Sequence, residues 1–337
     1  MLIIRTPFRI SFLGGGTDVK EYYERHGGGG VLSTTFDKYC YHFIRFCPPF
    51  FDYVGKLTYS KIEKFNEPSE IDHPAVREAL RDLNMTDLNI NYDADLPARS
   101  GLGTSSAFAV GLLNGLHVMR GELVDKMTLA KEAIELERVK CREAGGVQDQ
   151  LACAFGGLNK MVFTSKGYEV IPLPMLRERK EQFCNQLLLF FTGFTRKSST
   201  LLERQIANTK NKLRELDEMA SLVDDGVKVL LQNNDTDNFK EFGLLLDHTW
   251  KIKRSLTSGI SNDGLDAIYE KAKNAGAIGG KILGGGGGGF FLFMVEPDAR
   301  KNVIEALGDL PHVPFKLEDE GSKVIYFQSE SRLKEAQ

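Results

Sequence analysis

The spacing of apolar residues in the first half of the chain predicts strands and helices in mixed order. Runs rich in β-branched and aromatic residues indicate strands over residues 31–46 and 88–96 and a hairpin over residues 161–173. Between them, apolar residues recur at helical spacing over residues 105–119 and 125–141, which predicts two helices. We therefore expect the first half to be a mixed α and β domain.

The second half repeats this mixture with longer helices. A strand is expected over residues 186–194, followed by two long amphipathic helices over residues 198–231 and 236–256 with charged, solvated outer faces. The remaining expected elements are a helix over 263–274, strands over 278–283 and 290–295, a helix after Pro297 and a strand over 323–328. Strands and helices in this order indicate the α+β fold class.

The pattern is interrupted between the two halves by Pro172, Pro174 and the run RERKEQ at residues 177–182. A chain of 337 residues also suggests about two domains, at about 150 residues each. We therefore predict an N-terminal domain over residues 1–175 and a C-terminal domain over residues 176–337. Two domains allow a cleft between them.

Composition narrows the class of partner. The formal net charge is −3 and the acidic and basic residues are interspersed. This argues against a protein that binds nucleic acids or membrane surfaces and favours a small-molecule partner. The five cysteines are an odd number without a CxxC pair, which indicates reduced thiols in the cytoplasm. The longest apolar run, at residues 187–191, is far below the 18 or so residues of a membrane span, and no targeting signal is visible.

The stretch KILGGGGGGFFLF places six glycines, at positions 284–289, between two apolar runs. Such a run is either a slack linker or a place where something approaches the backbone closely. The common phosphate-loop templates do not fit: Ala275 and Ile282 break the pattern GxxxxGK[ST], and the glycines precede a predicted strand where a dinucleotide fingerprint opens a helix. A GxSxG elbow is absent as well.

The stretch DLPARSGLGTSSAFAVGL has the organisation of a phosphate-binding loop. A predicted strand ends at Pro97, Gly101 and Gly103 free the backbone, and a helix begins at the hydroxyls of Thr104, Ser105 and Ser106. A helix N-terminus presents unpaired N–H groups and a positive dipole end to polyphosphate, and a serine hydroxyl can ligate Mg²⁺. The alternative is a serine cluster that only caps the helix.

Three charged side chains have both a chemical and a structural interpretation. Glu137 falls on the apolar stripe of its predicted helix, so its carboxylate should be bound to a metal or paired with a basic residue. Asp149 begins a short helix after two glycines, where it is a catalytic carboxylate or a cap. Arg9, on a strand, can stabilise the charge of a transferring phosphoryl group, and Asp18, after three glycines, can hydrogen-bond sugar hydroxyls. The alternative is a structural ion pair between the two.

Taken together, three motifs resemble those of the GHMP small-molecule kinases, in the same order and over nearly the whole chain. The motifs are PFRI with Gly14 and Asp18, GLGTSSA after Pro97, and Lys281 with the glycine run. The resemblance implies an N-terminal β-α-β domain packed on a ferredoxin-like C-terminal domain, with ATP and the acceptor in the cleft. It also implies that the glycine run packs against the phosphate-binding loop.

The resemblance assigns roles to individual residues. It implies that Asp149 and Arg9 are catalytic and that Ser105 and Glu137 hold Mg²⁺. The residues implied to bind ATP are Pro97, Ser100, Gly101, Leu102, Gly103, Thr104, Ser105, Ser106, Gly286 and Gly287. Those expected to bind the acceptor are Gly16, Thr17, Asp18, Asp149, Arg196 and Lys197, with Arg99 as a further basic candidate for an acceptor phosphate.

Within this superfamily, FLGGGTDVKEYYERHGGGGVLSTTFDKYCY and TGFTRKSS resemble the sugar 1-kinases of D-glycero-D-manno-heptose 7-phosphate, with fucokinase domains as relatives. The resemblance implies ATP- and Mg²⁺-dependent formation of the 1,7-bisphosphate, on the route to nucleotide-activated heptose for bacterial surface polysaccharides. The alternatives are a kinase of L-fucose or another non-phosphorylated sugar, and a non-catalytic GHMP-fold binding module. We expect a cytoplasmic monomer or homodimer, without nucleic-acid or membrane partners and too short for the pyrophosphorylase module of bifunctional fucokinases.

Overall fold

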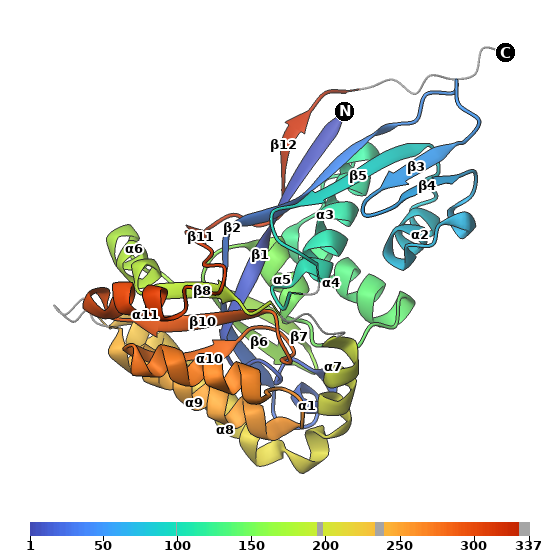
Figure 1. Ribbon diagram of the computed structural model, residues 1–337. Helices are drawn as coiled ribbons and strands as arrows, with labels where there is room; N and C mark the ends of the chain where they lie inside the picture. The colour runs from blue at the N-terminus through green and yellow to red at the C-terminus, as the bar shows by residue number, and fades with distance from the viewer. Residues whose placement is uncertain (99, 194–197, 233–238, 330–337) are drawn as a thin grey trace.

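The larger of two sheets contains strands from both ends of the chain. The computed structural model describes residues 1–98, 100–193, 198–232 and 239–329. Its nine-stranded sheet has the order β12-β1-β2-β5-β3-β4, with β6 and β11 also paired to β2 and β7 paired to β6 (Figure 1). The strands are β1 Leu2–Leu13, β2 Gly29–Phe46, β3 Gly55–Thr58, β4 Ile62–Phe65, β5 Leu88–Ala94, β6 Asn159–Thr164, β7 Gly167–Pro172, β11 Leu317–Glu318 and β12 Lys323–Phe327.

A long antiparallel pair, β1 with β2, forms the centre of this sheet, and helix α3 (Thr104–Met119) packs on it. Twelve of the sixteen residues of α3 are buried, as its nearly continuous apolar sequence requires. The other helices of this part of the chain are α1 Lys20–Tyr23, α2 Pro74–Asp82, α4 Lys126–Ile134, the π-helical η2 Glu135–Lys140 and α5 Gln148–Phe155. The N-terminal ends of α3 and α5 come close to the same stretch of β1, since Arg9 on that strand bonds both to Gly101, just before α3, and to Asp149 in the first turn of α5.

The second sheet is antiparallel, with the order β8 (Leu187–Phe191), β10 (Phe290–Val295) and β9 (Ala277–Ile282). Every residue of the central strand β10 is buried. The α-helices of this region are α6 Arg177–Asn185, α7 Ser198–Ala207, α8 Leu213–Leu231, α9 Lys240–Leu256, α10 Asp263–Asn274 and α11 Arg300–Ala306. The short 3₁₀ helices η3 Thr209–Asn211 and η4 Pro297–Ala299 precede α8 and α11, and a third, η1 Pro68–Glu70, precedes α2. Helix α9 contacts both sheets, since it packs on β9, β10 and β1.

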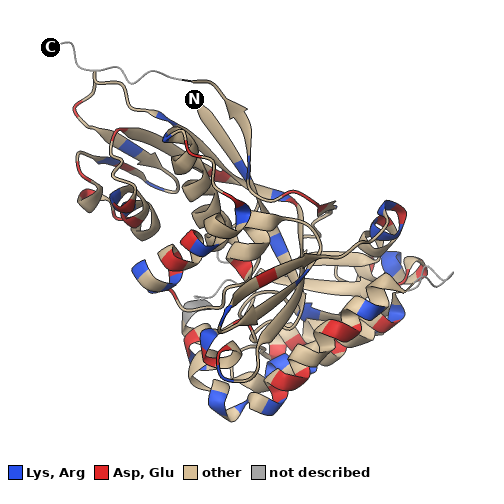
Figure 2. Cartoon of the chain, turned by 180° about the vertical axis from the view of Figure 1, so that it is seen from behind, with Lys and Arg blue, Asp and Glu red and all other residues tan. Residues whose placement is uncertain are grey.

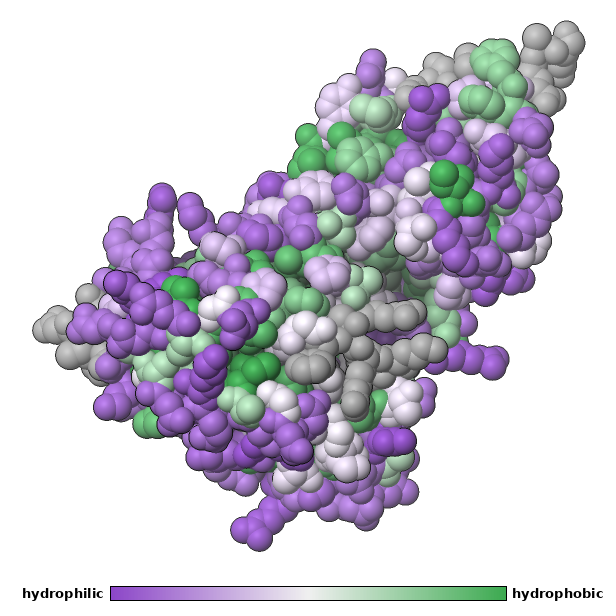
Figure 3. All heavy atoms as spheres, in the orientation of Figure 1, coloured by the Kyte–Doolittle hydropathy of each residue, from purple (hydrophilic) through white to green (hydrophobic). Residues whose placement is uncertain are grey.

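The molecule is elongated, and the region with α2, β3 and β4 stands away from the region with α8 to α11 (Figures 1 and 3). Basic and acidic residues are interspersed along the outer helices (Figure 2), which agrees with their charged amphipathic pattern. Within the described part of the chain, each helix is too short or too polar to cross a lipid bilayer.

The predicted α+β class is confirmed, but some predicted elements differ in extent. The expected helix over 198–231 is divided into α7, η3 and α8. At the break, the Asn208 side chain donates to the carbonyl of Leu256, and Lys212 has dihedral angles outside the helical region. The helix over 125–141 changes into the π-helical η2 at Glu135. The run RERKEQ, expected to interrupt the pattern, lies in α6, which the pattern missed because only Phe183 of that helix is buried.

The domain boundary at residues 175 and 176 stays a prediction. It falls between β7 and α6, yet β11 and β12, which come much later in the chain, pair with β2 and β1 of the larger sheet. The last strands of the chain therefore return to the sheet that its first strand helps to build.

Candidate active site

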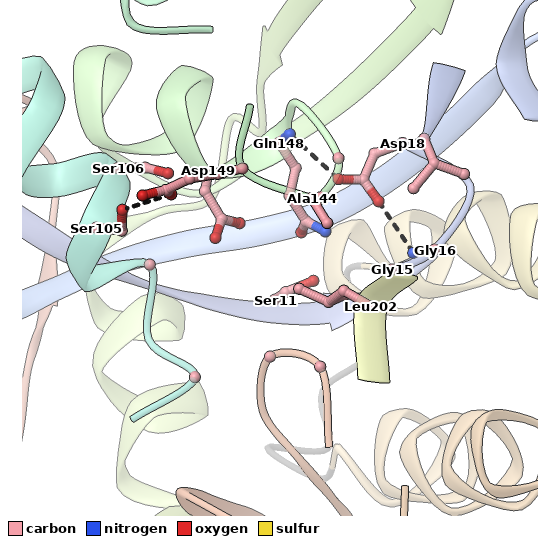
Figure 4. A pocket seen from close by; sticks show the side chains of 18 of the residues that line it. Ser11, Gly15, Gly16, Asp18, Ser105, Ser106, Ala144, Gln148, Asp149 and Leu202 are labelled. Atoms are coloured by element: carbon pink, nitrogen blue, oxygen red, sulfur yellow. Dashed lines mark hydrogen bonds between the residues drawn. The ribbon is translucent and has the colours of Figure 1, made fainter. Parts of the chain in front are cut away.

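A cavity of about 520 Å³ lies where the loop after β1, the N-terminal ends of α3 and α5, helices α7 and α9, and the glycine run meet. Figure 4 shows that its side chains come from elements far apart in the sequence. The charged residues on its wall are Arg9, Asp18, Glu137, Arg138, Arg142, Glu143, Asp149, Glu203, Lys253 and Lys281. Such a concave site with converging polar groups is the arrangement of a small-molecule binding site.

Two glycines shape the predicted phosphate-binding loop. Gly101 and Gly103 have φ angles of 81° and 73°, in the left-handed region that favours glycine, and they bring the chain into the first turn of α3. The helix cap is Gly103, which forms no side-chain cap, so Ser105 and Ser106 are not capping residues. Their hydroxyl groups are instead directed to Glu137. The loop therefore ends with an uncapped helix N-terminus that faces the cavity.

The Glu137 carboxylate is buried among neutral donors. It accepts hydrogen bonds from Ser105 Oγ at 2.6 Å, Ser106 Oγ at 2.7 Å and Gln150 Nε2 at 2.5 Å. Burial raises its pKa, which the nearby Arg138 charge partly opposes. Among the described residues no lysine or arginine forms an ion pair with it, so the structure lacks the salt bridge that was the alternative interpretation.

Arg9 and Asp149 form a bidentate ion pair on the wall of the cavity. Arg9 Nε and Nη2 each donate to an oxygen of Asp149 at 2.7 Å, and Arg9 Nη1 donates to the carbonyl of Gly101 at 2.6 Å. Burial alone would lower the pKa of this arginine, but Asp149 outweighs it and the pKa is raised. The pair thus ties the start of α5 to the phosphate-binding loop, and Arg9 pairs with Asp149 rather than with Asp18.

Asp18 lies on the opposite side of the cavity from the serines, in the loop after β1 (Figure 4). Its carboxylate accepts from the backbone N–H groups of Gly16 at 3.0 Å and Gln148 at 3.3 Å. Burial raises its pKa, and the negative charge of Asp149 raises it further. Asp18 and Asp149 therefore face one cavity from two different elements.

The glycine run packs directly on the predicted phosphate-binding loop. A Cβ on Gly284 would lie 2.4 Å from Gly101 Cα, and one on Gly289 would lie 2.3 Å from the Ser100 carbonyl oxygen. No side chain fits such contacts between two backbones, which answers why the chain carries glycine at these two positions. The expected close packing of the two loops is present, and a slack linker is not.

Two buried lysines bind backbone carbonyl groups beside the glycine run and on β1. Lys253 on α9 donates to the carbonyl oxygens of Ile282 and Gly284, and Lys281 on β9 donates to those of Ser11 and Phe12 at 2.9 and 2.7 Å. Burial, assisted by repulsion from Arg9, lowers the pKa of Lys253 to about 7. Burial also lowers the pKa of Lys281, with Lys253 as the next cause.

The cavity wall includes only part of the predicted site. The predicted residues on it are Arg9, Gly16, Asp18, Gly101, Gly103, Thr104, Ser105, Ser106, Glu137 and Asp149. Gly284 and Gly285 lie on the wall, whereas Gly286 and Gly287 contact Ile260. Other predicted residues lie off the wall: Pro97, the fully buried Ser100 and Leu102, and Thr17, whose hydroxyl bonds to Gly14 and Gly30. Arg99, Arg196 and Lys197 lie outside the described residues.

Sequence reasoning missed Ser11, Gln148 and Lys253. Ser11 and Gln148 had a usable signal, because Ser11 shares a strand face with Arg9 two residues earlier and Gln148 is adjacent to Asp149. Lys253 had none, since a lysine on an amphipathic helix is normally a solvated residue.

Comparison with known proteins places these features in one family. The protein-family model described as GHMP kinases N terminal domain matches residues 72–157, and the family model described as GHMP kinases C terminal matches residues 228–311. A D-glycero-alpha-D-manno-heptose 7-phosphate kinase of Campylobacter jejuni is 30% identical over 319 residues, which cover 90% of this chain and 92% of that protein.

More distant similarities agree with these matches. An L-fucokinase/L-fucose-1-P guanylyltransferase of Bacteroides fragilis is 26% identical over 340 residues, covering 89% of this chain and 35% of that protein. A solved structure of a D-glycero-D-manno-heptose 1-phosphate kinase from Bacteroides thetaiotaomicron has a TM-score of 0.79 at 24% identity, covering 98% of this chain and all of the other. At that identity the likeness concerns the fold.

Proposed function

The chain belongs to the GHMP kinases, and from this premise we propose that it transfers the γ-phosphoryl group of ATP to the anomeric hydroxyl of D-glycero-D-manno-heptose 7-phosphate. Membership confirms the predicted family and fold, and the enzymes of this family use ATP. The acceptor is proposed because the Campylobacter jejuni relative, similar over nine tenths of both chains, carries the name of a heptose 7-phosphate kinase.

The observation that carries the proposal is the Arg9–Asp149 pair beside the N-terminus of α3. Each Asp149 oxygen accepts one bond from Arg9 and keeps lone-pair capacity for the acceptor hydroxyl. In the reaction the anomeric oxygen bonds to the γ-phosphorus, the bond from that phosphorus to ADP breaks, and the hydroxyl proton moves to Asp149. Because Arg9 also holds the Gly101 carbonyl, it keeps acceptor and phosphate-binding loop in fixed relation.

We propose that Ser105 and Glu137 hold the Mg²⁺ ion that accompanies ATP. The donors suit it, since Mg²⁺ prefers oxygen ligands and the buried Glu137 carboxylate has hydroxyl and amide partners rather than a cation. When bound, the ion supplies positive charge that neutralises the phosphate oxygens. Glu143 adds a second carboxylate near Ser105, which donates to its Oε2 at 3.2 Å.

A kinase of L-fucose or another non-phosphorylated sugar is the second candidate, favoured by the similarity to the Bacteroides fragilis fucokinase. We also propose a cytoplasmic enzyme, monomer or homodimer, and the unpaired state of all five cysteines supports the cytoplasmic location.

A coupled assay of ADP release, with heptose 7-phosphate, mannose, fucose and galactose as acceptors, tests the proposal. We expect turnover with the heptose phosphate and at least about a hundredfold lower kcat/KM with the three free sugars, because a site built for a phosphate loses charged hydrogen bonds without it. Equal activity on fucose would favour the second candidate. ADP release with none of the acceptors would favour a non-catalytic binding module.

A further inference from the structure

Two polar side chains on the cavity wall have buried atoms without a hydrogen-bond partner. Ser11 is 5% exposed and Gln148 is 9% exposed, and neither Ser11 Oγ nor Gln148 Oε1 has a partner in the described part of the protein. Buried polar atoms are normally hydrogen-bonded, because desolvating them without a partner is unfavourable. Both residues line the cavity, so a bound molecule can supply the missing partners.

These two side chains lie beside the catalytic pair. Ser11 follows Arg9 by two residues on β1 and so projects from the same face of the strand, while Gln148 immediately precedes Asp149 at the start of α5. In Figure 4 the end of the Gln148 side chain lies beside the Asp149 carboxylate and above Ser11. Strand and helix therefore contribute two neighbouring pairs to one wall, Arg9 with Asp149 and Ser11 with Gln148.

Gly15 keeps the space between Ser11 and Gln148 open. A Cβ built on Gly15 would lie 3.5 Å from Ser11 Oγ and 3.7 Å from Gln148 Nε2, at ordinary van der Waals distance from both. A methyl group therefore fits there without a clash, and it would occupy space that a ligand could use. Since Gly15 is not among the glycines with positive φ, its conformation does not demand glycine.

The chemistry of this space suits a neutral hydroxyl group. A serine hydroxyl and a carboxamide offer both donors and acceptors, which match a hydroxyl that donates and accepts at once. The Asp18 carboxylate, which accepts from the backbone N–H of Gln148, disfavours a phosphate at this point, because like charges repel. A ring hydroxyl of a sugar fits these conditions better than the phosphate of the acceptor or of ATP.

We propose that Ser11 and Gln148 bind a ring hydroxyl of the acceptor sugar next to the one that is phosphorylated, in the space kept open by Gly15. The inference rests on the proposed sugar kinase function and deepens it by naming residues that select the acceptor. Neither residue takes part in proton or phosphoryl transfer, so their effect is on acceptor binding.

Calorimetric titration of the full chain with heptose 7-phosphate, and separately with ATP, tests the inference. The variants are Ser11→Ala, Gln148→Met and Gly15→Ala, and the matched control is Ser33→Ala. Ser33 pairs with Ser11 across the strands and has a buried, unpartnered hydroxyl, but it does not line the cavity. We expect Ser11→Ala and Gln148→Met to weaken acceptor binding about 3- to 10-fold, as loss of one neutral hydrogen bond implies. Gly15→Ala should weaken it as well, because its methyl group occupies the space of the hydroxyl. ATP binding and melting temperature should be unchanged in all three variants.

Monodeoxy analogues of the acceptor provide a second readout. The analogue that lacks the recognised hydroxyl should bind wild type more weakly than the parent sugar does. This difference should be about 3- to 10-fold smaller in Ser11→Ala and in Gln148→Met, because each variant has already lost one of the two hydrogen bonds to that hydroxyl. If wild type binds the sugar and these variants bind it with the same affinity, the inference is overturned but the proposed function is not. A wild type that binds no sugar overturns the proposed function and the inference with it. If Ser11→Ala or Gln148→Met fails to fold, the acceptor affinity of Gly15→Ala still tests the inference, because its methyl group makes no clash.

Discussion

Replacing Gly284 with alanine tests how the glycine run works. The new Cβ would lie 2.4 Å from Gly101 Cα and 2.9 Å from the Gly101 carbonyl oxygen, and Gly284 has a φ of 70°. Neither neighbour is a flexible side chain that can move aside. Gly285→Ala is the matched control, because it adds the same atom one residue later, where the nearest atom is Leu202 Cγ at 3.1 Å and φ is not positive.

The magnitude has two parts. Left-handed backbone is unfavourable for alanine by about 1 to 2 kcal/mol, and an overpacked contact between two backbones adds about 1 to 3 kcal/mol. Gly284→Ala should therefore destabilise the native arrangement by about 2 to 5 kcal/mol. The Leu202 side chain can turn away in the control, so Gly285→Ala should stay below about 1 kcal/mol.

The strain can be relieved by partial unfolding or by separation of the two loops, so two measurements are needed. Thermal melting reports the first, and the dissociation constant of ATP, measured by calorimetry, reports the second, where each 1.4 kcal/mol corresponds to about a tenfold change. We expect Gly284→Ala to be clearly impaired in at least one of them and Gly285→Ala to stay near wild type. If the two variants match each other in both measurements, the glycine run does not pack tightly on the Gly101 loop in solution.

Three further outcomes follow from the site. Asp149→Asn removes the proposed proton acceptor and should lower kcat at least about a hundredfold, with ATP affinity maintained; near wild-type turnover would remove Asp149 from the mechanism. The melting temperature should fall as well, because the buried Arg9 loses its negatively charged partner. Glu137→Gln should raise the Mg²⁺ concentration for half-maximal rate and weaken Mg²⁺–ADP binding in calorimetry, whereas a lower melting temperature alone would indicate a structural role. Lys253 has a pKa lowered to about 7, so between about pH 7 and its unfolded pKa the unfolded chain binds more protons and folding stability rises with pH. Denaturant titrations of wild type from pH 6 to 9 should show this rise relative to Lys253→Met, and parallel profiles would contradict it.

Much of the fold could be predicted because it depends on local periodicity. Alternating or continuous apolar residues marked β2, β5 and β10, and the predicted helix over 263–274 coincides with α10. Where an element lacks a buried stripe, as in α6, the same reasoning had no signal and missed it. The break between α7 and α8 was missed for a different reason, since the Asn208 bond that accompanies it is made to Leu256, 48 residues later.

The sequence by itself determined the family and the α+β class and supplied candidate site residues, because motifs and periodicities are local properties of the chain. Only the tertiary structure decided which groups meet. It paired Arg9 with Asp149, 140 residues away, rather than with Asp18, and it surrounded Glu137 with serine hydroxyls instead of a basic partner. It also brought Gly284 onto Gly101 and left Ser11 and Gln148 unpartnered at the cavity. Such contacts depend on how β1, α3, α5 and β9 pack together, and packing joins residues whose separation along the chain carries no information about their distance.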